Sequence, residues 1–184
     1  MDMQERRHTI AVLVDNEPGV LARVIGLFSG RGYNIDSLTV AEVDQERGLS
    51  RINIVTHGPE VVIEQIKNLL GRLVPVHTVR DLTLDGDAVE REMALVKVQG
   101  DRDKLISALR IADFMQARQV DSTHESFVFE ITGRPNQIDS FIHLVEPAEV
   151  ARAGVVAMSR GLRTLSERDN GNGHSTEDAS GAAA

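Results

Sequence analysis

Hydrophobic and polar positions in the first half of the chain alternate between strand-like and helix-like periods. Residues 8–14 form a β-branched and aliphatic run of strand length, and residues 20–28 place apolar side chains at helical spacing. Residues 33–43 and 49–56 predict two strands joined by a short polar hairpin link. A second amphipathic helix begins near residue 60, and residues 74–84 predict a strand that Pro75 places near a sheet edge.

The same order recurs in the second half of the chain. Residues 93–98 predict a strand, residues 101–115 a helix, and residues 119–123 with 126–132 a hairpin. A helix over 135–145 and a last strand over 150–158 complete the unit. The pattern predicts an α+β protein with two ferredoxin-like βαββαβ domains, each a four-stranded antiparallel sheet with two helices on one face. We place the domains at residues 1–84 and 85–163.

The C-terminal segment has a different composition. From Ser166 onward it contains no Val, Ile, Leu, Met or aromatic residue, and four acidic residues stand against one basic residue. Such a segment buries too little apolar surface to offset the entropy of ordering, so residues 164–184 are predicted to form a disordered acidic tail.

Composition narrows the functional classes. The 184 residues carry a formal net charge of −8, which argues against nucleic acid or an anionic membrane as a partner. There is no cysteine, and therefore no disulfide, thiolate nucleophile or Cys-based zinc site. Aromatic residues are only 3% of the chain, too few for stacking platforms. No signal peptide or apolar membrane span is apparent, which predicts a cytoplasmic protein.

Catalytic motifs are also missing from the sequence. There is no nucleophile elbow or phosphate-binding loop, and the six histidines are not spaced as metal ligands. The Gly30-Arg31-Gly32 segment follows a predicted helix and precedes a strand, the reverse of a dinucleotide-binding fingerprint. We therefore predict neither a catalytic residue nor a metal site.

One loop has the chemistry of a small-molecule site. Asn16 and Gly19 precede the first predicted helix, whose free N–H groups and partial positive charge suit a small carboxylate. An Asn amide can also accept from an ammonium group, and Gly19 would let a ligand approach the backbone. Asn34 could complete the crevice from a neighbouring chain. The alternative is ordinary helix capping by Asp15 or Asn16, with Asn34 as a turn residue.

Two blocks of sequence carry a family resemblance. Residues 15–28, DNEPGVLARVIGLF, and residues 31–40, RGYNIDSLTV, closely resemble the ACT domain of the acetolactate synthase (acetohydroxyacid synthase) small subunit. Residues 49–51, LSR, and 152–161, RAGVVAMSRG, are similar to the same family. The resemblance covers about residues 6–163.

The resemblance implies a non-catalytic regulatory subunit in branched-chain amino acid biosynthesis, covering valine and isoleucine. Such a subunit binds and activates a separate catalytic subunit, to which thiamine diphosphate, magnesium and FAD belong, and confers feedback inhibition by valine. It holds no cofactor of its own. It forms a homodimer through its ACT domains, with the effector between the two chains. Carried over to this sequence, the effector site comprises Asn16, Gly19, Val20 and Leu21 from one chain and Asn34 and Ile35 from the other.

Two other classes remain as alternatives. One is a free-standing amino-acid sensor or transcriptional co-regulator, although no helix-turn-helix segment or basic helix is visible. The other is a small metal-dependent enzyme, which a stoichiometric metal in the purified protein would support.

Overall fold

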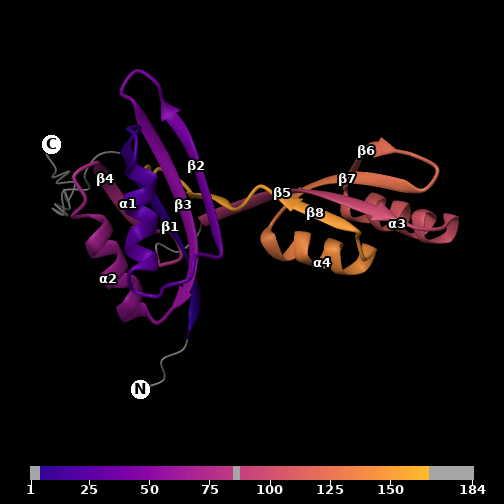
Figure 1. Cartoon of the computed structure of the whole chain (residues 1–184), viewed down its shortest axis with the longest axis horizontal. Coiled ribbons are helices and arrows are strands. Elements are labelled where there is room, and N and C mark those ends of the chain that lie inside the picture. The colour runs from indigo at the N-terminus through magenta and orange to yellow at the C-terminus, as the bar shows by residue number, and fades with distance from the viewer. Residues whose placement is uncertain (1–4, 85–87, 166–184) are drawn as a thin grey trace, which may run out of the picture.

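The first half of the chain folds into a four-stranded antiparallel sheet covered on one face by two helices (Figure 1). The computed structural model describes residues 5–84 and 88–165. The strand order is β2-β3-β1-β4, which is that of a ferredoxin-like βαββαβ unit. Its elements are β1 (Arg6–Asp15), α1 (Val20–Ser29), β2 (Ser37–Asp44), β3 (Leu49–Gly58), α2 (Glu60–Leu70) and β4 (Val76–Asp81).

The second half repeats this architecture. Its sheet has the order β6-β7-β5-β8, the same path in the new strands, and again two helices cover one face (Figure 1). The predicted α+β class with two such units is confirmed. Its elements are β5 (Ala88–Gln99), α3 (Arg102–Met115), β6 (Arg118–Ser122), β7 (Ser126–Gly133), α4 (Pro135–Val145), β8 (Glu149–Arg152) and a further strand, β9 (Val156–Ser159).

Each unit has its own hydrophobic core between sheet and helices. In the first, Ile10 and Val12 of β1 pack against Val24 and Phe28 of α1, all essentially buried. In the second, the buried ring of Phe129 meets Phe141 edge to face, with ring centroids 6.0 Å apart. Alternate β1 residues, such as Ala11, are equally buried although they face away from the helices. Another element must therefore cover the outer face of the first sheet.

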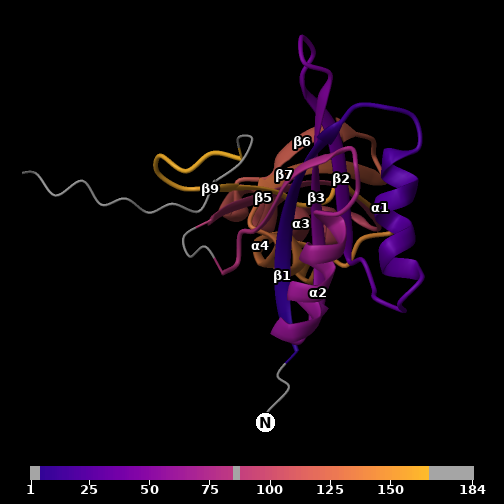
Figure 2. The ribbon, with the colours of Figure 1, turned by 90° about the vertical axis from the view of Figure 1, so that its left-hand side faces the viewer.

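That covering element is a two-stranded ribbon from the second half of the chain. The first four residues of β5, Ala88 to Arg91, pair with β9 rather than with the second sheet, and we call this pair the β5–β9 ribbon. Figure 2 shows the ribbon and α1 on opposite sides of the first sheet. Ala157 of β9 packs on Ala11 and Leu82, and Thr9 donates to Glu90 at 2.5 Å.

The ribbon corrects our prediction of the last strand. Residues 150–158 form two strands, because the chain turns at Gly154, whose φ is +87°, leaves the edge of the second sheet and pairs instead with the beginning of β5. Gly154 lies so close to β2 that a Cβ atom there would be 2.8 Å from Thr39 Cγ2. The backbone N–H of Val155 donates to Ser37 Oγ at 2.9 Å. β5 is correspondingly longer than the predicted 93–98.

Smaller differences concern element ends. β2 begins at Ser37 rather than at residue 33, and β4 is shorter than the predicted 74–84 but lies at a sheet edge as Pro75 indicated. The boundary proposed at residues 84 and 85 adjoins residues 85–87, and the predicted tail lies almost wholly in 166–184; both stretches are outside the described residues. Within the described part of the chain, no helix is long and apolar enough to cross a membrane.

Candidate functional site

The start of α1 is an uncapped helix N-terminus. Its N-cap residue is Gly19, with φ +86° and ψ −7°, and no side chain accepts a hydrogen bond from the first turn. The first turn also contains no acidic residue. Because the first N–H groups of a helix have no intrahelical acceptor and carry its positive partial charge, this end of α1 suits a small anion such as a carboxylate.

Asp15 and Asn16, just before α1, are engaged away from the helix, whereas Glu17 Oε1 lies 3.5 Å from Arg23 Nη1 of α1. Asn16 Nδ2 donates to Glu42 Oε1 of β2 at 3.0 Å, and Asp15 Oδ1 lies 2.6 Å from His77 Nε2 of β4. The backbone N–H of Asn16 donates to Gly48 O at 2.6 Å, which fixes the loop against the β2–β3 hairpin. The alternative that Asp15 or Asn16 caps α1 is therefore wrong.

The two apolar candidates of the first turn have different environments. Val20 is buried in the first core, so its side chain supports the helix rather than facing a ligand. Leu21 is 38% exposed and presents an aliphatic surface at the helix start. The open space around Gly19 lies beside it, since no atom comes within 4 Å of the position a Gly19 Cβ would occupy.

Asn34 and Ile35 lie at the other end of α1, between Ser29 and the start of β2. Asn34 Nδ2 donates to Asp36 Oδ1 at 2.8 Å, and its backbone oxygen accepts from Thr56 Oγ1 at 2.6 Å. Ile35 is half-buried against the first core. Ten helical residues span about 15 Å, so a single chain does not bring the two groups of predicted residues together.

Two carboxylates that lie near the candidate site residues were not predicted from the sequence. Glu42 reaches Asn16 only because β2 passes beside the loop, which no local pattern reveals. Asp36 holds Asn34 and also lies 2.6 Å from His57 Nδ1. Its position two residues after Asn34 was a signal that could have been used. Among residues 5–84 and 88–165, no three His, Asp or Glu side chains gather to hold a metal ion.

Both halves of the chain match models of known protein families. Residues 10–78 match the model described as the AHAS small subunit-like ACT domain. Residues 91–161 match the model described as the small subunit of acetolactate synthase. The first unit, with its uncapped helix start, is therefore an ACT domain, and the protein is of the ACT-domain class.

Similarity to relatives extends over most of the chain. A probable acetolactate synthase small subunit of Archaeoglobus fulgidus is 42% identical over 84% of this chain and 98% of its own. The acetolactate synthase isozyme 3 small subunit of Escherichia coli is 42% identical over 86% and 99%. The crystal structure of the Thermotoga maritima acetolactate synthase small subunit superposes with a TM-score of 0.76 at 39% identity, over 85% and 98% of the two chains. The chain belongs to the acetolactate synthase small-subunit family.

Proposed function

We propose that this chain is the regulatory subunit of an acetolactate synthase in branched-chain amino acid biosynthesis. It binds and activates a catalytic subunit and makes that subunit sensitive to valine. Thiamine diphosphate, magnesium and FAD belong to the catalytic partner in this proposal, so this chain contributes binding and regulation rather than chemistry. The observation that carries the proposal is the uncapped start of α1 in an ACT domain.

A valine zwitterion matches this helix start in charge and size. Its carboxylate would accept from first-turn N–H groups beyond Val20, whose own N–H already donates to Glu17 O at 3.4 Å, and the helix dipole favours a negative charge there. Its isopropyl group would lie against the exposed Leu21. The oxygen of the Asn16 amide is available to the ammonium group, because the hydrogen bond to Glu42 uses the amide nitrogen.

A homodimer paired along β2 would complete the site. β2 is an edge strand of the first sheet, with a row of backbone groups open to a second copy. The Asn16–Glu42 hydrogen bond places the loop beside the C-terminal end of β2. Antiparallel pairing sets the start of the partner strand beside that end. Asn34 and Ile35 precede that start, so the second copy would bring them to Asn16 and Gly19.

Reconstitution with a purified catalytic subunit tests the regulatory role. We expect a higher rate of acetolactate formation when this chain is added, and inhibition by valine only in the mixture. A catalytic subunit with the same rate and the same valine response in the presence and absence of this chain would overturn the proposal.

The effector site is tested by Gly19→Asp against Gly19→Asn. Asp and Asn have nearly the same shape and tolerate a positive φ better than other side chains do, so the pair isolates the added charge. Two like charges about 4 Å apart repel by about 1–4 kcal/mol between fully aqueous and protein-surface screening. We expect Gly19→Asp to lose valine inhibition more completely than Gly19→Asn, while both still activate. Inhibition of Gly19→Asp at wild-type valine concentrations would count against this site.

A further inference from the structure

An apolar groove lies between the first sheet and the β5–β9 ribbon, away from the helix start. It is a cavity of about 440 Å³ beside the β2 edge. Four of its aliphatic side chains, those of Val40, Val43, Val156 and Met158, are 44–61% exposed and form a contiguous apolar patch rather than scattered surface residues. We call it the ribbon groove and define it by Val40, Val43, Val156, Met158, Arg51 and Arg91.

Arg51 is an unneutralised cation within this groove. Its side chain is half-buried, with Nε donating to Asn53 Oδ1 at 3.2 Å and Nη2 donating to Ala157 O at 2.5 Å. Both acceptors are neutral, and no carboxylate of the described residues forms an ion pair with it. Burial accordingly lowers the pKa of the Arg51 guanidinium from its ordinary value. Taking a charge out of water costs free energy that a nearby opposite charge would offset.

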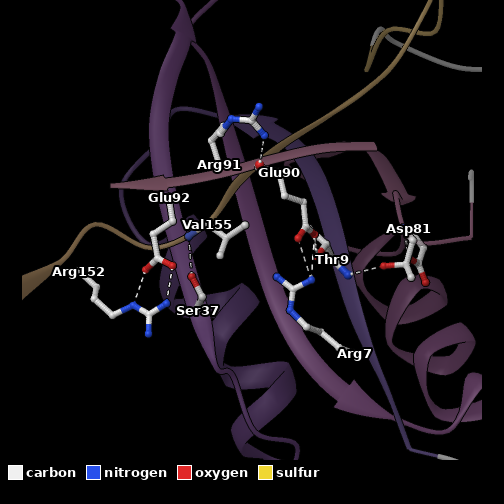
Figure 3. Close-up of polar contacts among 10 residues, drawn as sticks. Arg7, Thr9, Ser37, Asp81, Glu90, Arg91, Glu92, Arg152 and Val155 are labelled. Atoms are coloured by element: carbon white, nitrogen blue, oxygen red, sulfur yellow. Dashed lines mark hydrogen bonds and ion pairs between the residues drawn. The ribbon is translucent and has the colours of Figure 1, made fainter. Parts of the chain in front are cut away.

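Arg91 adds a second positive charge at the rim of the groove. Its Nη1 donates to its neighbour's backbone oxygen, Glu90 O, at 2.8 Å. The acidic residues on either side are engaged elsewhere, Glu90 with Arg7 and Glu92 with Arg152 (Figure 3). Within residues 5–84 and 88–165, Arg91 forms no ion pair. The ribbon groove thus combines an apolar lining with two arginines that lack a carboxylate.

We propose that the ribbon groove is the docking surface for the catalytic subunit, and that it takes a segment presenting aliphatic side chains next to a carboxylate. This rests on the proposed regulatory function and adds the surface through which it acts. The carboxylate would pair with Arg51 and Arg91, and the aliphatic groups would cover Val156 and Met158. Arginine and apolar anchors in a partly desolvated pocket are typical of the residues that dominate protein interfaces.

The proposed homodimer uses the backbone edge of β2, and a second copy docked on the groove itself fits less well. A two-fold contact of groove on groove repeats the same surface, so it would oppose each arginine pair to its own copy. Like charges at close range repel, and the cations would remain unneutralised. The occupant must therefore differ from the groove in charge, which a partner protein with an acidic segment satisfies.

Two charge-introducing substitutions test the surface. Met158→Glu places a carboxylate on the apolar lining, and Arg91→Glu reverses the charge at the rim; both side chains are exposed, so the fold should persist. The matched control is Val61→Glu, which makes the same kind of change at a 70% exposed position on α2, across the first sheet from the ribbon. Circular dichroism verifies folding, and calorimetry measures binding to the purified catalytic subunit.

We expect the two groove variants to bind the catalytic subunit about tenfold more weakly or worse, while Val61→Glu binds like the wild type. Valine binding by the free variants should not change, because the groove and the helix start are separate. Wild-type affinity in both groove variants would overturn the inference. So would a change of oligomeric state, measured by sedimentation, with catalytic-subunit binding intact, since a second copy would then occupy the groove. A wild-type chain that binds no catalytic subunit would instead refute the proposed function.

Discussion

Replacing Gly154 by alanine should push the ribbon segment away from β2. The new Cβ would lie 2.8 Å from Thr39 Cγ2, closer than real Cβ atoms approach another atom, and 3.0 Å from Ser37 Oγ, which is a tight contact. A non-glycine residue at φ +87° costs about 1–2 kcal/mol, and overpacking a filled contact costs about 1–3 kcal/mol. We therefore expect Gly154→Ala to reduce the free energy of unfolding by about 2–5 kcal/mol.

Gly48→Ala is the matched control for backbone strain. Gly48 has φ +62°, and no atom lies within 4 Å of its would-be Cβ, so only the strain of about 1–2 kcal/mol applies. Equilibrium urea unfolding followed by circular dichroism gives both losses. The difference between the two variants, about 1–3 kcal/mol, is the contribution of the close contact.

The position of the effect can be verified independently. The amide of Val155, which donates to Ser37 Oγ, should exchange with deuterium faster in Gly154→Ala and at the wild-type rate in Gly48→Ala. Adding Thr39→Ser removes the Cγ2 contact and should restore part of the stability lost by Gly154→Ala. Equal losses of unfolding free energy in the two alanine variants, with no recovery in the double variant, would show that the close approach of Gly154 to β2 does not affect stability.

Three further variants and one control probe the second unit by urea unfolding. Arg152→Ala should cost about 3 kcal/mol, because it leaves the buried carboxylate of Glu92 without its two charged hydrogen bonds; a loss below 1 kcal/mol would contradict this. The Glu92 hydrogen bond raises the pKa of Arg152 above its ordinary value, so this contribution should stay constant through neutral and mildly alkaline pH and decline only at higher pH. Asp101→Ala removes the acceptor for the Lys104 N–H at the start of α3, and about 1 kcal/mol should be lost. Phe129→Ala should cost about 3–5 kcal/mol through the cavity it leaves beside Phe141, whereas Phe114→Ala, at an exposed position, should be nearly neutral.

The order of elements could be predicted because each core face has a clear period. The aliphatic run in β1 and the helical spacing in α1 and α4 mark buried positions directly, and the structure confirms these elements. The first half of β5 was missed because Glu90 and Glu92 make it polar. Their burial depends on Arg7 and Arg152, which are remote in sequence and visible only in the fold.

One feature of the sequence could have predicted that the last strand divides into two. A glycine inside a strand pattern often marks a close backbone approach, and Gly154 occupies that position. No local pattern showed where the chain goes after Gly154, because β9 packs on the sheet formed by the first half of the chain. The ribbon groove forms where β9 crosses the first sheet, so the sequence neighbours of Arg51 did not show that it is a half-buried cation without a carboxylate partner.

The start of α1 differs from the starts of α2 and α3. At α3 the side chain of Asp101 accepts from the first turn, and α2 carries Glu60 in its first turn. α1 has neither, although Asp15 and Asn16 stand just before it and are suitable capping types. Both are bound instead to residues of neighbouring strands. A glycine N-cap in place of a side-chain cap forgoes only about a few tenths of a kcal/mol of helix stability, and the N–H groups left without a side-chain acceptor are those that a bound carboxylate would satisfy.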